Sequence, residues 1–110
     1  MSHRIEKINE LIQQQMAEIL TRALDIKPGV FMTISKVDTS RDLRYTRIFL
    51  SIFPERESDY ALKTLEKELY RLQGILNKKL SMRPLPRIEF VQDLTGSKAD
   101  EVERILKIIK

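Results

Sequence analysis

The sequence has no cysteine, a single histidine and only three glycines. Without cysteine, the chain can form no disulfide, no thiolate nucleophile and no cysteine-based zinc or iron–sulfur site. His3 lies near the N-terminus and has no second histidine with which to share a metal ion, so we expect no metal and no cofactor. No glycine-rich phosphate-binding loop is present either. The core must therefore be held by packing.

Long hydrophobic runs are also missing. Charged residues interrupt the apolar residues of the first twenty positions, namely Arg4, Glu6, Lys7, Glu10 and Glu18. A secretory signal or a membrane span needs a continuous apolar stretch, which this segment does not provide. We therefore expect no membrane association and a cytoplasmic location.

The remaining composition is typical of one globular protein. A chain of 110 residues with 42% hydrophobic and 33% charged residues is long enough for one core, so we expect a single domain over residues 1–110. The formal net charge of +4 is a modest excess, and by itself it does not indicate an RNA partner.

The first half predicts a helix followed by a β-hairpin. Apolar residues recur three or four positions apart between residues 4 and 24, which is the spacing of one helical face. Pro28 and Gly29 end this helix. Residues 30–37 are rich in β-branched and apolar side chains, and residues 46–53 alternate Ile48, Leu50 and Ile52 with Arg47, Phe49 and Ser51. We therefore predict two strands joined by a polar loop over residues 38–44.

The second half predicts a helical region, a third strand and a last helix. Ser58 and Asp59 can cap a helix that carries one leucine stripe, Leu62, Leu65, Leu69, Leu72, Leu76 and Leu80. Gly74 can mark a bend, so one bent helix or two are possible, and the unbroken stripe favours a slight bend. Residues 87–91 alternate as a strand, and Ser97 can cap a helix bearing Val102, Ile105, Leu106 and Ile109.

This order of elements predicts the fold class. Each element is apolar on one side only, and helices packed on one face of a small sheet bury all of these sides. We predict an α+β fold of order α-β-β-α(-α)-β-α, with a mixed three-stranded sheet covered on one face by helices. Type-II KH domains share this order.

Positive charge is concentrated in two segments. Every charged residue between positions 71 and 87 is basic, and a second group lies on the hairpin. Such clusters can neutralise phosphates and release counterions, and the arginine fork can hold phosphate oxygens bidentately. The candidate rRNA-binding residues are Arg41, Arg44, Arg47, Arg71, Lys78, Lys79, Arg83 and Arg87.

Each of these residues also has a structural interpretation. A single lysine or arginine on a helix is more often part of a solvated face, and Arg83 could instead cap helical carbonyls. We expect Tyr45, Phe49 and Phe53 to pack in the core or across strands rather than to stack on bases. We expect Asp38 and Asp42 to bond their own backbone in the loop rather than to act as acid and base, and Asp93 to act as a turn or cap residue.

Two segments resemble the ribosome-binding factor A family. One is the hairpin run Val37-Asp38-Thr39-Ser40-Arg41-Asp42-Leu43, and the other is Met82-Arg83-Pro84-Leu85-Pro86-Arg87-Ile88-Glu89-Phe90-Val91-Gln92-Asp93. The resemblance covers nearly the whole chain. Where family members carry an Ala-x-Gly kink, a gapless alignment places Glu68-Leu69-Tyr70. The second glycine of a KH GxxG loop is also missing after Gly74, so we expect recognition of RNA shape and backbone.

The resemblance implies a monomeric, non-enzymatic assembly factor. Its partners would be the free small (30S) ribosomal subunit and its 16S rRNA, near the 5′ end and the decoding region. It would assist late rRNA maturation and matter most in the cold. Two other interpretations stay open, a protein-interaction module that uses the hairpin edge or the leucine stripe without binding RNA, and a small enzyme with a cleft of convergent titratable groups.

Overall fold

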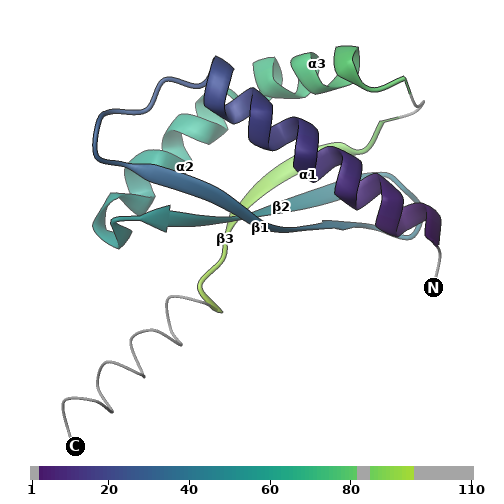
Figure 1. Cartoon of the computed structure of the whole chain (residues 1–110), viewed down its shortest axis with the longest axis horizontal. Coiled ribbons are helices and arrows are strands. Elements are labelled where there is room, and N and C mark those ends of the chain that lie inside the picture. The colour runs from purple at the N-terminus through teal and green to yellow at the C-terminus, as the bar shows by residue number, and fades with distance from the viewer. Residues whose placement is uncertain (1–2, 82–84, 96–110) are drawn as a thin grey trace, which may run out of the picture.

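The computed structural model describes residues 3–81 and 85–95. Within them the chain forms three α-helices and three strands, with one short 3-10 turn at Glu55–Glu57 (Figure 1). The elements follow in the order α1 (His3–Ala23), β1 (Phe31–Thr39), β2 (Tyr45–Phe53), α2 (Ser58–Lys67), α3 (Leu69–Lys79) and β3 (Arg87–Gln92). This is the predicted order as far as β3, and the helix predicted after Ser97 lies outside the described residues.

The sheet has the mixed topology that the sequence predicts. β1 pairs with β2 in antiparallel register, and β2 pairs with β3 in parallel register, so β2 is the central strand. The helical region between β2 and β3 supplies the long connection that parallel strands require. The α+β fold with a mixed three-stranded sheet is therefore confirmed.

One face of the sheet packs against the helices. On β2 the buried side chains of Thr46, Ile48, Leu50 and Ile52 alternate with side chains that point to the other face. The buried set joins one core cluster with Ile12 and Met16 of α1 and with the leucines of α2 and α3. Since burial of apolar area contributes roughly 25 cal/mol per Å², this single layer of side chains supplies most of the driving force for folding.

The leucine stripe is buried, but the expected slight bend is wrong. Leu65, Leu72 and Leu76 are fully buried, yet the chain leaves helical geometry at Glu68, which has φ −96° and ψ 3°. Figure 1 shows α2 and α3 running in clearly different directions. Gly74 lies inside α3 and does not mark the break. Spacing by three and four residues persists across the break because both helices turn their leucines toward the same core.

The hairpin loop is shorter than predicted. β1 continues to Thr39, so Asp38 lies in the strand and not in the loop, where the polar run of the sequence had predicted it. The extension follows from two facing threonines, Thr39 and Thr46, which are register partners and whose hydroxyl oxygens lie 2.8 Å apart in the core. Within the described residues, no helix is both long and apolar enough to cross a membrane.

Candidate nucleic-acid interface

The hairpin loop is held by Ser40 and Asp42. The Ser40 hydroxyl donates to Asp42 Oδ1 at 2.7 Å, and the backbone N–H of Arg44 donates to the same oxygen at 3.1 Å. The hydrogen bond from Ser40, followed by that from the Arg44 backbone, holds the pKa of Asp42 below its ordinary value of 3.8. Asp42 is therefore an ionised turn residue, as expected, and is not suited to acid–base catalysis at neutral pH.

The hairpin loop lies beside the start of β3. The backbone N–H of Arg87 donates to the carbonyl oxygen of Arg44 at 2.8 Å, and Arg87 is the register partner of Tyr45. The fold thereby sets Arg44 beside Arg87, which lies 43 positions later in the sequence. Arg41, Arg44 and Arg87 are exposed, and the contact of Arg44 with Asp42 is long, 3.8 Å from Nε to Oδ2.

Two of the candidate arginines have close carboxylate partners. Arg47 Nε lies 3.2 Å from Glu89 Oε1, and both side chains are about two-thirds exposed, 65% and 64%. Arg71 Nε lies 2.6 Å from Glu68 Oε1, and its Nη2 donates to the carbonyl oxygen of Ala23 at 2.7 Å. Arg71 thus fastens the start of α3 to the end of α1, and its contact with RNA stays a prediction.

The end of α3 carries exposed lysines. Lys78 and Lys79 form its last turn, and neither makes an ion pair within the part of the chain that the structure describes. Gln73 fixes this helix to the third strand, because its side-chain amide donates to the Pro86 carbonyl and accepts from the backbone N–H of Ile88. Arg83 lies outside the described residues.

The other face of the sheet is open and carries aromatic side chains. Phe31, Tyr45 and Phe53 are 64%, 58% and 68% exposed. Phe49 is half-buried, with Lys36 Nζ 4.7 Å from the centre of its ring. We expected Tyr45, Phe49 and Phe53 to pack either in the core or across strands. The first of these two expectations, packing in the core, is wrong. The alternation of side chains along β2 already indicates this exposure, because it sets the rings on the face opposite the aliphatic residues of the same strand. Lys36 was not predicted from the sequence at all.

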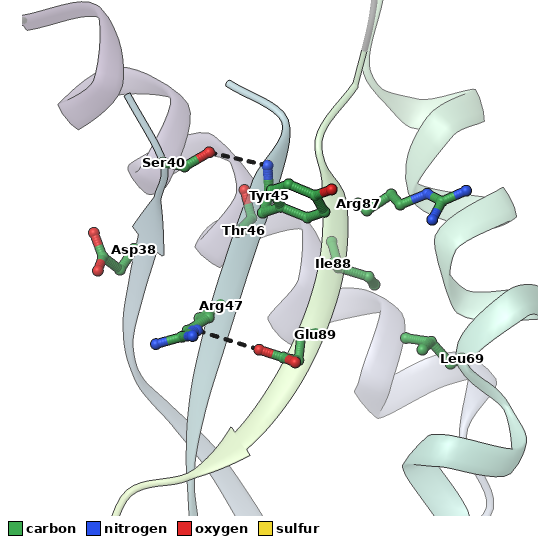
Figure 2. A pocket seen from close by; sticks show the side chains of 9 residues that line it. All are labelled: Asp38, Ser40, Tyr45, Thr46, Arg47, Leu69, Arg87, Ile88 and Glu89. Atoms are coloured by element: carbon green, nitrogen blue, oxygen red, sulfur yellow. Dashed lines mark hydrogen bonds and ion pairs between the residues drawn. The ribbon is translucent and has the colours of Figure 1, made fainter. Parts of the chain in front are cut away.

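A depression of about 640 Å³ lies at the hairpin end of β2 and β3, between the open face and the start of α3 (Figure 2). Figure 2 shows Tyr45 lying above the strands, and Arg47 and Glu89 reaching toward one another across them. The lining residues are Asp38, Ser40, Tyr45, Thr46, Arg47, Leu69, Arg87, Ile88 and Glu89. Among the described residues, no group of histidine, aspartate and glutamate side chains is arranged to hold a metal ion.

Asp93 ends the third strand as a turn residue. Ser35 Oγ donates to Asp93 Oδ2 at 2.5 Å, and the backbone N–H of Thr95 donates to Asp93 Oδ1 at 3.0 Å. The Ser35 hydrogen bond is the main reason that the pKa of Asp93 lies below its ordinary value of 3.8. The predicted turn or cap role is confirmed, and the contact ties β1 to the exit of β3 across the central strand.

Comparison with known proteins identifies the family. The family profile described as Ribosome-binding factor A matches residues 4–106. Ribosome-binding factor A of Dictyoglomus thermophilum is 34% identical over 109 residues, which cover 97% of this chain and 91% of the relative. The crystal structure of ribosome-binding factor A from Thermus thermophilus superposes with a TM-score of 0.69 at 28% identity, over 80% of this chain and 93% of that chain.

The same Thermus thermophilus factor also matches as a component of a complex. This match is a homology model of the factor fitted into a cryo-EM map of its complex with the 30S subunit, with a TM-score of 0.66 at 30% identity. This similarity covers 77% of the present chain and 90% of the fitted one. The family profile spans most of the sequence, and the structure superposes on most of the crystallised relative. The chain belongs to the ribosome-binding factor A family.

Proposed function

We propose that this protein is an assembly factor that binds the free small ribosomal subunit and assists late maturation of its 16S rRNA. The observation that carries the proposal is the family match over residues 4–106, together with a relative that has been fitted into a 30S complex. The protein acts as a monomeric single domain in the cytoplasm, by binding and not by catalysis, and its contribution is greatest in the cold. One core cluster that draws on all three helices and all three strands supports the single domain.

Cationic side chains carry the contact with rRNA in this proposal. The junction of the hairpin with β3 supports it, because exposed Arg41, Arg44 and Arg87 come from segments far apart in the sequence. Lys78 and Lys79 at the end of α3 add positive charge that has no ion-pair partner among residues 3–81 and 85–95. The full proposed set is Arg41, Arg44, Arg47, Arg71, Lys78, Lys79, Arg83 and Arg87.

Charge reversal tests the proposal. The variant Lys78→Glu/Lys79→Glu/Arg83→Glu should bind free small subunits more weakly than the wild type in cosedimentation at low salt. Each phosphate contact that is lost should flatten the plot of log affinity against log salt by about 0.7–0.9, because fewer counterions are released on binding. Unchanged thermal unfolding would show that the fold is intact.

A second triple variant controls for net charge. Arg56, Lys63 and Lys67 are exposed on the segment from Glu55 to Lys67 and lie outside the proposed set, so their reversal to Glu changes the net charge equally. This control should bind subunits better than the first variant. Equal binding by both variants would move the interface elsewhere. A wild-type protein that stays free of subunits at every salt concentration would overturn the function, and binding to a protein but to no RNA would favour an interaction module.

A further inference from the structure

The open sheet face combines exposed aromatic rings with cations. We define it as the outward side chains of the three strands, Phe31, Thr33, Lys36, Asp38, Tyr45, Arg47, Phe49, Ser51, Phe53, Arg87, Glu89 and Val91. It is the face opposite the helices. We propose that the open sheet face binds unpaired RNA, with bases stacked on Tyr45, Phe49 and Phe53 and with phosphates held by Lys36, Arg47 and Arg87. This inference rests on the proposed RNA-binding function and adds to it a ligand class and a surface that shares Arg47 and Arg87 with the proposed set.

The spacing of the rings on β2 suits an extended single strand with further nucleotides between the stacked bases, because adjacent nucleotides of a stacked strand lie only about 3.4 Å apart. Tyr45, Phe49 and Phe53 are four residues apart on one strand, and a rise of about 3.4 Å per residue separates neighbouring rings by about 14 Å. Arg47 and Ser51 lie between them on the same face. Sheet-based RNA-binding proteins stack bases on aromatic side chains of an open sheet face, and the polar groups between the rings of β2 add hydrogen-bonding positions.

The exposure of these rings needs an explanation. Tyr45 and Phe53 are more than half exposed, although aromatic side chains gain most from burial, and the register partner of Phe53 is the equally exposed Phe31. Neither ring contributes to the core, which the opposite face of the same strand fills. Stacking of a base on an aromatic ring is worth about 1–3 kcal/mol, so bound nucleotides would stabilise this arrangement.

Cations from all three strands flank the rings. Lys36 on β1 lies over the ring of Phe49, so its ammonium group must move toward a phosphate when a base stacks there. Arg47 lies on β2, and Arg87 on β3 is the register partner of Tyr45. The ion pair between Arg47 and Glu89 is largely exposed, and exposed pairs contribute about 0–1 kcal/mol, so a phosphate can replace the carboxylate at little cost. The positions of these cations complement a chain of phosphates that runs beside the stacked bases.

The polar groups between the rings favour RNA over a protein partner. Protein interfaces bury a contiguous apolar centre that is depleted in charge, whereas here Arg47 and Ser51 separate the three rings of β2. A single pair of rings, Phe31 with Phe53, is in register across the strands. Duplex RNA keeps its bases stacked inside the helix and cannot place them on the rings. The expected ligand is therefore a single strand.

Binding of a single-stranded oligouridylate to the full chain tests the inference. The variant Tyr45→Leu/Phe49→Leu/Phe53→Leu removes the rings and keeps every charge, so its affinity should fall by about tenfold or more for each stacked base that is lost, with the salt slope unchanged. The control is Tyr70→Leu, because Tyr70 is 94% exposed but lies on α3. It should bind as the wild type does.

Tyrosine fluorescence gives a second readout. The sequence has no tryptophan, so emission comes from its three tyrosines, of which Tyr45 alone lies on the open sheet face. Oligouridylate should quench the emission of the wild type and of Tyr70→Leu, and quenching should be lost in Tyr45→Leu. Quenching that persists in Tyr45→Leu would overturn the inference.

Cosedimentation with small subunits separates the two proposals. Wild-type protein that binds subunits, together with a triple-leucine variant that binds oligouridylate as tightly as the wild type, would overturn the stacking surface alone. Wild-type protein that binds no subunits would overturn the proposed function. Tight self-association that protects the rings at assay concentrations, or their protection by residues 96–110 in the full chain, would also overturn the stacking surface.

Discussion

At the scale of single residues, the buried polar side chains explain where the hairpin is fixed. Thr39 Oγ1 donates to Asn9 Oδ1 at 2.6 Å, so the contact between the two threonine hydroxyls must use the proton of Thr46. Both threonines are at least 95% buried. The chain of three side chains connects α1 to both strands of the hairpin and leaves no hydroxyl unpaired.

Thr39→Val should cost more stability than Thr46→Val. Loss of the Thr39 hydroxyl leaves the buried Thr46 hydroxyl and the Asn9 carbonyl without partners, which costs about 1–3 kcal/mol. Loss of the Thr46 hydroxyl leaves the bond from Thr39 to Asn9 in place. Urea denaturation should rank the two variants in this order, with exposed Thr33→Val as a nearly neutral control. Equal losses in the two variants would contradict the assigned direction of the hydrogen bonds.

For single residues, the positions of the basic side chains were easier to predict than the carboxylates and carbonyls with which they pair. The basic run from Arg71 to Arg87 is visible in the sequence, but the ion pair of Arg71 with Glu68 and its bond to Ala23 arise only when α3 packs against α1. Lys36 was missed because no local pattern sets it beside Phe49. A β-bulge between Ile34 and Lys36 shifts the register there, and only strand pairing reveals it.

At the scale of elements, the spacing of apolar residues predicted the helices and strands but not the junction between α2 and α3. The spacing of apolar residues gave α1, β2 and β3 to within about two residues, because one buried face dictates the side-chain period. The break at Glu68 does not interrupt the spacing of the apolar residues, because the leucines on both sides of it pack into the same core. Glycine was the wrong marker: a Cβ added at Gly74 would meet no atom within 4 Å, and its φ lies outside the positive range.

Gly74→Ala should therefore stabilise the protein. Alanine in a helix interior is favoured over glycine by about 0.5–1 kcal/mol, and here it creates no clash. Gly29→Ala is the matched contrast, because Gly29 has φ 89° in the turn before β1 and alanine there is strained by about 1–2 kcal/mol. Chemical denaturation should show changes of opposite sign. A loss of stability in Gly74→Ala would mean that the glycine serves a close approach absent from this structure.

At the scale of the whole molecule, the two faces of the sheet have different roles. Helices bury one face and provide the stability of the fold, while the proposed contacts with RNA use the other face, the hairpin loop at its end, and Arg71, Lys78 and Lys79 on α3. Two ionised carboxylates stabilise the hairpin loop and the end of β3. Asp42 organises the hairpin loop, and Asp93 ties the exit of β3 to Ser35 of β1.

These carboxylates predict how stability depends on pH. Both pKa values are lower in the folded state than the ordinary 3.8, so the unfolded chain binds protons first as the pH falls. Their stabilising contribution is complete well above pH 3.8 and is lost as the pH falls below 3.8 through the folded-state values. The melting temperature should therefore drop in this acidic range.

Ser35→Ala and Ser40→Ala remove the main cause of each shift, so they should raise the pKa of Asp93 and Asp42 toward 3.8 and flatten the acid-side dependence of the melting temperature on pH. Carboxyl ¹³C titration by NMR measures the pKa values directly, with exposed Ser51→Ala as the control, and a slope unchanged in both variants would contradict this role.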